Sequence, residues 1–229
     1  MARIILIETS TALCSVALEE DGRVVAYKEN PGRVHASLTA PFVKEVLDSQ
    51  GLGVKDCDAV CVGKGPGSYT GLRVGASTAK GLCFGADIPL LAVGSTEVLV
   101  WQAKAESLIP EGCKYIVPMI DARRMEVYTA VYSPDGQQLR ATEAKIIDKD
   151  SFAQELSESP VLFIGDGAEK CRSVIDSPKA HFITCYPKAS SLALPAELAL
   201  KEKRFEDTAY FEPFYLKDFI ATVSRKRLF

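Results

Sequence analysis

Apolar and polar positions near the start of the chain follow the pattern of three antiparallel strands. Residues 4–8 form an apolar, β-branched run, and residues 15–18 form a second one. The dipeptide Asp21-Gly22, which favours a hairpin, then separates this run from a third at 24–27. We therefore expect a three-stranded antiparallel sheet at the beginning of the chain.

The pattern then changes to that of alternating helices and buried strands. Leu38, Phe42 and Val46 recur near a helical period, which predicts a helix over 36–50. Short, continuously apolar strands are expected at 59–62 and 90–93. Helices are expected over 68–84 and 95–105.

The second half repeats this order. It predicts three strands, helix, strand and helix in sequence, and one more helix follows near the end (115–121, 126–132, a third strand to 147, 151–157, 161–164, 168–175, and a helix to about 202). In each half an acid, Glu8 or Asp121, ends the first strand before an Asp-Gly turn. The repetition indicates an internal duplication. We expect an α/β, actin-like (ribonuclease H-like) fold of two domains, 1–108 and 109–229, with a mixed sheet in each and a reduced second half.

Composition indicates a globular protein: 47% of its 229 residues are hydrophobic and 25% are charged. No apolar run is long enough to span a bilayer, and no secretory signal is recognisable, so we expect a cytoplasmic protein without membrane contact. The seven cysteines form no CxxC pair, and we interpret Cys57 and Cys61 as packing residues rather than half of a metal site. The net charge of −3 argues against strong binding of tRNA by the chain alone, although residues 225–227 are basic.

A glycine-rich segment at 63–73 follows a predicted strand and opens a helix. Gly65 and Gly67 permit tight turns, and a helix N-terminus offers N–H groups to an anion. A phosphate loop and a plain strand-to-helix turn are equally compatible with this segment, which lacks the Walker A pattern. In actin-like folds the first hairpin turn of each half faces phosphate, so the same alternatives apply to two further sets of residues (Glu8, Thr9 and Ser10; Asp121 and Arg123).

Small residues follow one face of the predicted helix 68–84. Gly71, Gly75, Ala79 and Cys83 are each four positions apart, and Ala76 widens the stripe. Interior glycine costs helix stability, which makes sense where another backbone packs closely. That backbone is either the chain's own sheet or a helix of another subunit.

Catalytic patterns are scarce. The two histidines, His35 and His181, are far apart in the sequence, and no nucleophile elbow of the Gly-x-Ser-x-Gly type is present. We therefore expect no catalytic residues and no metal site.

The segments 7–10, 65–73, 121–128 and 213–217 together resemble the TsaB family, which takes part in tRNA threonylcarbamoyladenosine synthesis and was once described as glycoprotease-like. The resemblance implies a non-catalytic subunit that binds the catalytic subunit TsaD, is joined by the ATPase TsaE, and forms a homodimer when TsaD is absent. It implies that tRNA is met only through the complex. It also implies that no cofactor binds tightly to this chain alone. Whether ATP or ADP binds in the assembled complex is left open. Where the related catalytic subunits have a histidine pair on a helix, this chain retains His35 alone.

On this basis we predict that the partner surface is formed by the helices at 36–50 and 68–84. Its expected residues come from both helices (His35, Leu38, Phe42, Tyr69, Leu72, Arg73, Gly75, Ala76 and Ala79). Two other classes of function remain as alternatives. One is an active enzyme, such as a transferase, a small-molecule kinase or a glycoprotease-type hydrolase. The other is a nucleotide-binding module that joins no complex.

Overall fold

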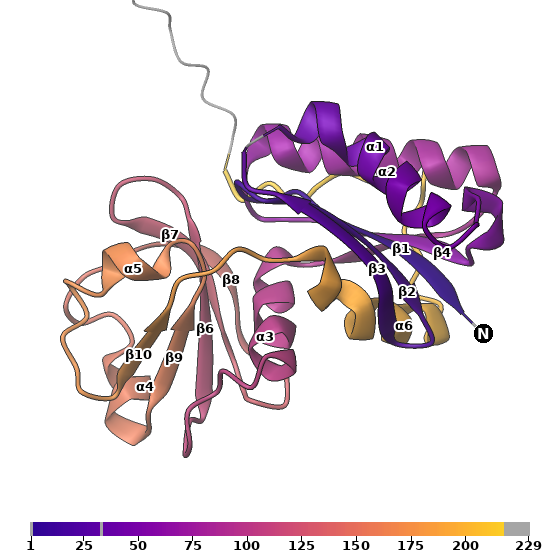
Figure 1. Cartoon of the computed structure of the whole chain (residues 1–229). Coiled ribbons are helices and arrows are strands. Elements are labelled where there is room, and N and C mark those ends of the chain that lie inside the picture. Colours follow the sequence, from indigo (N-terminus) through magenta and orange to yellow (C-terminus); the bar gives the residue numbers. More distant parts are fainter. Residues whose placement is uncertain (1, 33, 218–229) are drawn as a thin grey trace, which may run out of the picture.

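Two five-stranded mixed sheets with the same strand order form the centres of the two halves of the molecule (Figure 1). The computed structural model describes residues 2–32 and 34–217. The order is β3-β2-β1-β4-β5 in the first sheet and β8-β7-β6-β9-β10 in the second. The first three strands of each half pair antiparallel, and the remaining pairs are parallel. The predicted duplication and the α/β actin-like fold class are thereby confirmed.

The first half contains the longer helices. Its elements in chain order are β1 (Arg3–Glu8), β2 (Cys14–Glu20), β3 (Arg23–Asn30), α1 (His35–Asp48), the short 3₁₀ helix η1 (Val54–Asp56), β4 (Ala59–Gly63), α2 (Tyr69–Ala86), β5 (Leu90–Val93) and α3 (Ser95–Ala105).

The second half has the same plan with shortened helices. Its elements are β6 (Tyr115–Asp121), β7 (Glu126–Tyr132), β8 (Gln138–Ile146), α4 (Ala153–Glu158), β9 (Val161–Ile164), α5 (Ala168–Cys171) and β10 (Ala180–Ile183), followed by the 3₁₀ helix η2 (Ala189–Leu192) and α6 (Ala193–Lys201). The helices α4 and α5 have 6 and 4 residues, against 14 and 18 in α1 and α2. The reduction of the second half therefore lies in its helices, while its sheet is complete. The helix expected over 168–175 is shorter than predicted, and strand β10 was not predicted.

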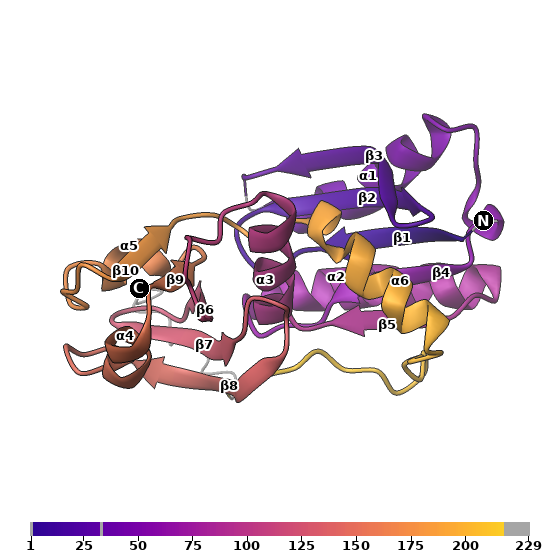
Figure 2. The same cartoon turned by 90° about the horizontal axis from the view of Figure 1, so that it is seen from below.

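Each sheet is covered on both faces. Helices α1 and α2 pack on one face of the first sheet, and α6 lies across the other (Figure 2). Helix α3 lies between the halves, because Val98 joins the first core while Leu99 and Ala103 join the core of the second sheet. Residues 189–201 return to the first half and bury Leu192 and Ala196 against β1 and β4.

This packing corrects the expected division at residue 108. The chain after 189, which the prediction assigned to the second domain, covers the first sheet, and α3 contributes to the second core. Burial of apolar surface explains why residues 189–201 return to the first half. Without them, the face of the first sheet opposite α1 and α2 would meet water.

The cysteines behave as predicted. All seven are free, six of them are buried, and Cys57 and Cys61 lie inside the first half. Burial raises the pKa of the Cys57, Cys83 and Cys171 thiols to about 11. No helix in the described ranges 2–32 and 34–217 has the length and apolar character needed to cross a membrane.

Candidate ligand cleft and partner surface

The glycine-rich loop is packed onto the first hairpin turn of its own chain. The backbone N–H of Ser68 donates to the carbonyl oxygen of Ser10 at 2.6 Å. The Thr9 hydroxyl donates to the carbonyl oxygen of Gly71 at 2.8 Å. Ser68 caps α2, since its hydroxyl oxygen accepts the N–H of Gly71 at 3.3 Å. The loop and the turn are thus interlocked.

This packing explains two of the glycines directly. A Cβ on Gly67 would overlap the carbonyl oxygen of Ser10, and a Cβ on Gly71 would overlap that of Thr9. Gly65 has a φ of +104°, a conformation that side chains disfavour. Of the two interpretations of the loop, a strand-to-helix turn that packs tightly on its own sheet accounts for these glycines without a phosphate.

A cavity of ≈ 790 Å³ nevertheless lies between the halves, beside the loop. It is lined by both halves of the chain, and several residues predicted from the sequence meet there (Ser10, His35, Gly67, Tyr69, Leu72, Asp121 and Arg123). Glu8, Thr9 and Gly65 do not line it. Glu8 and Thr9 are fully buried.

The first-half wall of the cavity contains polar atoms without partners. His35 Nε2 lies 2.7 Å from the carbonyl oxygen of Thr11, which can only accept, so Nε2 is the donor. His35 Nδ1, Ser10 Oγ and Thr11 Oγ1 are buried and have no hydrogen-bond partner among the described residues. Buried polar atoms are normally paired, so this wall is unusual for an ordinary core.

The buried acid behind this wall is also unusual. Glu8 is fully buried, and burial raises its pKa to about 7, while hydrogen bonding from Ser10, whose N–H donates to Oε1 at 2.6 Å, opposes the shift. Its Oε2 has no partner among the described residues. Glu8 is therefore a buried acid of the core that does not line the cavity.

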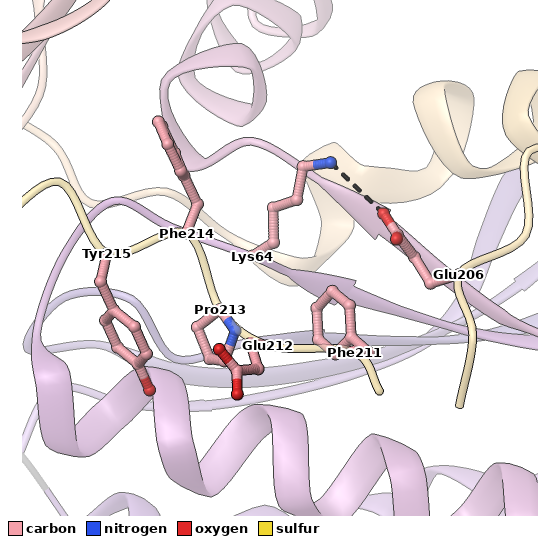
Figure 3. A pocket seen from close by; sticks show the side chains of 7 residues that line it. All are labelled: Lys64, Glu206, Phe211, Glu212, Pro213, Phe214 and Tyr215. Carbon is pink, nitrogen blue, oxygen red and sulfur yellow. Dashed lines mark hydrogen bonds and ion pairs between the residues drawn. The ribbon is translucent and has the colours of Figure 1, made fainter. Parts of the chain in front are cut away.

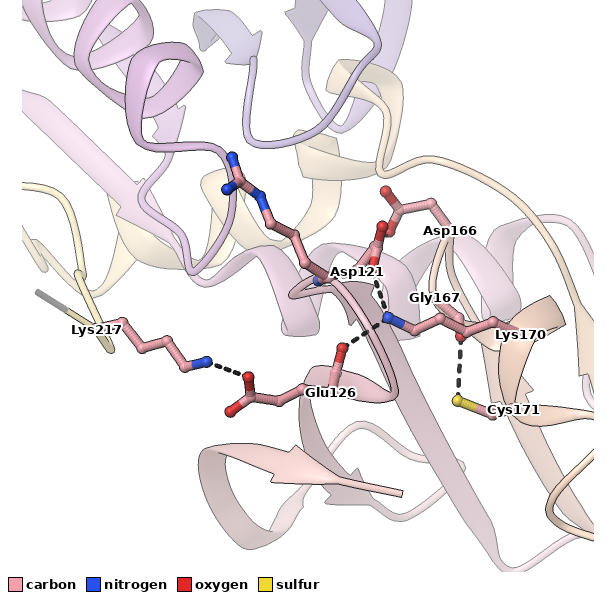
Figure 4. Close-up of polar contacts among 8 residues, drawn as sticks. Asp121, Glu126, Asp166, Gly167, Lys170, Cys171 and Lys217 are labelled. Carbon is pink, nitrogen blue, oxygen red and sulfur yellow. Dashed lines mark hydrogen bonds and ion pairs between the residues drawn. The ribbon is translucent and has the colours of Figure 1, made fainter. Parts of the chain in front are cut away.

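The opposite wall lies in the second half and includes Asp121, Arg123 and Asp166; Lys170 does not line the cavity but contacts this wall through Asp121 (Figure 4). Lys170 pairs with Asp121 and donates to the carbonyl oxygen of Glu126 at 2.7 Å. Asp166 accepts the N–H of Asp121 at 3.0 Å, and burial raises the pKa of Asp166 to about 6. Asp121 also accepts the N–H of Arg123 at 2.9 Å. Asp121 and Arg123 were predicted from the sequence, whereas Asp166 and Lys170 were not, because they come from a different segment and meet the first two only in the folded chain.

The segment 211–217 lies over the loop. Residues 211–215 line a shallow cavity of ≈ 440 Å³ together with Lys64 and Glu206, whose side chains pair at 3.3 Å. Figure 3 shows the side chains that line it. The Tyr215 ring lies 4.7 Å from that of Tyr69 at the start of α2, and the Arg73 guanidinium lies 4.2 Å from the centre of the Tyr69 ring. The sequence reading noted this segment as a family feature without placing it beside the loop.

The small-residue stripe faces the chain's own sheet. Gly71, Gly75, Ala79 and Cys83 are buried, and a Cβ on Gly75 would overlap the Thr9 hydroxyl. The expectation that Gly75 and Ala79 let a second subunit approach is therefore wrong, because Thr9 and Val62 of the same chain are the close neighbours of Gly75, and Ala79 is fully buried. His35, Phe42, Leu72 and Ala76 are buried as well, while Leu38 and Tyr69 are partly buried and Arg73 is exposed.

The outer face of α2 carries different residues, exposed at each turn of the helix (Thr70, Arg73, Ser77, Gly81 and Phe84). Phe84 is 87% exposed. Among the large hydrophobic side chains of the described residues, Phe84 has the greatest exposure. The sequence reading missed Phe84, because helical period alone did not reveal which side of α2 faces the sheet.

A cleft between two halves of equal strand order places the chain in the class of two-domain, actin-like proteins. A family model described as "TsaD: tRNA N6-adenosine threonylcarbamoyltransferase" matches residues 29–224. The TsaB protein of Haemophilus influenzae is 30% identical over 224 residues, which span 94% of this chain and 93% of that protein. The Bacillus subtilis protein of the same name is 30% identical over 93% of each chain.

Two further comparisons agree. The TsaB protein of Escherichia coli is 38% identical over a shorter stretch, 58% of this chain and 56% of that protein. The crystal structure of a Pseudomonas aeruginosa protein described as similar to peptidase YEAZ superposes with a TM-score of 0.82 at 28% identity, covering 95% of this chain and all of that one. The chain belongs to the TsaB family of tRNA threonylcarbamoyladenosine biosynthesis proteins, as its motifs predicted.

Proposed function

We propose that this chain is a non-catalytic, cytoplasmic subunit of the complex that forms N6-threonylcarbamoyladenosine in tRNA. In this proposal it binds and supports a TsaD-type catalytic subunit, with TsaE joining the assembly, and tRNA is met only through the complex. Membership of the TsaB family is the observation that carries the proposal. The alternatives of a kinase, a transferase and a peptidase have no comparable support in the site.

The interlocked loop and turn favour an accessory role. In an actin-like enzyme the first hairpin turn approaches a phosphate, whereas here the glycine loop packs on Ser10 and Thr9. We propose that the chain alone binds no nucleotide tightly, and that ATP or ADP binds in the assembled complex.

We propose the outer face of α2 as the partner surface, revised from the residues predicted from the sequence. Arg73, Ser77, Gly81 and Phe84 give this face a cation, small residues and one exposed ring. Exposed aromatic and arginine side chains are typical anchors of protein interfaces. The same face would pair two copies of the chain when TsaD is absent.

Reconstitution tests this function. The purified chain, a TsaD-type subunit and TsaE are combined with tRNA, threonine, bicarbonate, ATP and the enzyme that supplies the threonylcarbamoyl donor, and modified adenosine is measured. We expect tRNA to be modified by the complete mixture and not by the mixture that lacks this chain. We also expect no modification when TsaD is left out and this chain is present. Modification by the chain without TsaD would overturn the accessory role, and undiminished modification without the chain would overturn its participation.

A further inference from the structure

The last described segment is fixed firmly to the first half. The N–H of Phe214 donates to the carbonyl oxygen of Lys64 at 2.7 Å. The Lys80 ammonium donates to the carbonyl oxygens of Ala209 and Phe211 at 3.0 and 3.1 Å. Phe211 is buried in the core beneath α2. The path of the chain up to Phe214 is therefore set by first-half contacts.

Beyond Phe214 the segment crosses to the second half. Residues 214–217, here called the strap, all line the cavity between the halves. Tyr215 rests on Tyr69 of the first half, and Lys217 forms an ion pair with Glu126 at the start of β7 (Figure 4). The strap thus joins one wall of the cavity to the other.

The turn that the strap contacts, residues 121–126, is also held by Lys170. Glu126 presents its carboxylate to Lys217 while its carbonyl oxygen accepts from Lys170, which also pairs with Asp121. The ion pair between Lys217 and Glu126 therefore also restrains the turn 121–126. Arg123 of this turn lines the cavity.

We propose that the strap is a latch: the Lys217–Glu126 ion pair keeps the cleft between the halves closed, and its release opens the cleft at His35. The unpaired buried atoms of Ser10, Thr11 and His35 fit a closed state that excludes water from polar groups. Opening lets these atoms pair with water, which offsets the loss of the ion pair. The two states are thereby brought close in free energy, as a switch requires.

The latch is sensitive to salt. The Lys217 and Glu126 side chains are 41% and 24% exposed, so dissolved ions screen their attraction. Exposed pairs of this kind change an equilibrium by roughly two- to fivefold. We expect the open fraction to rise by this factor when the pair is removed.

The two histidines of the chain provide the measurement. His35 is buried in the cavity wall, whereas His181 is exposed on β10 and serves as an internal reference. Carbethoxylation of each histidine by diethyl pyrocarbonate is followed by peptide mass spectrometry on the full chain. The rate at His35, relative to His181, reports how often the cleft opens.

Removal of either partner should have the same effect. Lys217→Gln and Glu126→Gln should each speed modification of His35 by roughly two- to fivefold, and the double variant should add little. High salt should speed it in the wild type and not in the variants. The matched control is Lys28→Gln, which removes the same charge from a pair with Glu45 at 2.9 Å inside the first half and should leave the rate unchanged.

Two results would overturn the latch. One is modification of His35 at the wild-type rate in both Lys217→Gln and Glu126→Gln, which would mean that the strap restrains nothing. The other is equal acceleration by Lys28→Gln, which would mean that loss of any surface charge loosens the chain.

Discussion

Thr9 and Gly71 hold the turn after strand β1 against helix α2: the Thr9 hydroxyl donates a 2.8 Å hydrogen bond to the Gly71 carbonyl oxygen, and the same hydroxyl fills the space beside Gly75. Thr9, directly after the strand, and Gly71 and Gly75, in successive turns of α2, therefore form one contact. The glycines of α2 serve this contact.

Gly75→Leu should destabilise the folded chain. A side chain at position 75 would overlap the Thr9 hydroxyl and approach Val62, and overpacking of this kind typically costs about 1–3 kcal/mol. Urea denaturation followed by circular dichroism measures the loss.

Gly81→Leu is the matched control on the same helix. No atom lies within 4 Å of a Cβ placed on Gly81, which is exposed. Leucine is the better helix former, so stability should stay level or rise by up to about 1 kcal/mol. Equal destabilisation by both variants would show that glycine at either position serves α2 itself and not its packing on Thr9.

Thr9→Val should weaken the same contact without changing its shape. The substitution removes the donor to Gly71 and leaves the buried surface nearly unchanged, so we expect a loss of about 1 kcal/mol in the free energy of unfolding. Thr9→Ser retains the hydroxyl, and its loss should come mainly from the missing methyl group. A valine variant as stable as the wild type would contradict a role for the hydrogen bond.

Periodicity and turn residues were enough to predict the order of the strands and α-helices except for β10, because each predicted element alternates or repeats within a few residues. The direction of the α2 stripe could not be predicted, since Gly75 and Gly81 look alike in sequence and differ only in what lies beside them. The packing of residues 189–201 on the first sheet could not be predicted either, because it depends on which apolar face of the folded sheet the other helices leave uncovered. Asp121 in the cleft wall was predicted from its place at the end of a strand, whereas its partner Lys170 has no such signal in the sequence. The basic residues 225–227 lie outside the described part of the chain.

The stability of the chain should fall between pH 5 and pH 8 in part because of Glu8. Burial raises the pKa of Glu8 to about 7 from 4.5, so the folded state retains a proton that the unfolded chain has released. Folding takes up this proton between the two values, and the free energy of unfolding therefore decreases as the pH rises through this window. The contribution is about 3 kcal/mol at most.

Glu8→Gln should remove this part of the pH dependence, because the amide resembles the protonated acid at every pH. Urea denaturation at pH 5 and pH 8 should show a smaller difference than in the wild type, with the variant relatively more stable at pH 8. Glu212→Gln, which removes a charge from an exposed side chain, is the control. An unchanged difference in Glu8→Gln would mean that Glu8 is ionised in the folded chain throughout this range.

The isolated chain should bind tRNA weakly. Phosphate contacts dominate affinity for nucleic acids, and the net charge of −3 gives no general attraction. We expect a dissociation constant no tighter than the non-specific range of about 10⁻⁴–10⁻⁶ M at physiological salt. Fluorescence anisotropy with labelled tRNA at several salt concentrations measures it, and tight, salt-resistant binding would contradict the expectation.

Phe84→Asp should weaken binding of the TsaD-type partner while leaving the fold intact. The Phe84 ring is 87% exposed and contributes little to the core, so the urea midpoint should not fall. Loss of an aromatic anchor at an interface costs about 2 kcal/mol or more, and 1.4 kcal/mol is tenfold in affinity, so binding should weaken by about 30-fold or more. Ile146→Asp is the matched control, because Ile146 is 71% exposed on β8 of the second half. Titration calorimetry with the partner compares the two variants. Full-strength binding by Phe84→Asp, or an equal loss in Ile146→Asp, would place the partner surface elsewhere than the outer face of α2.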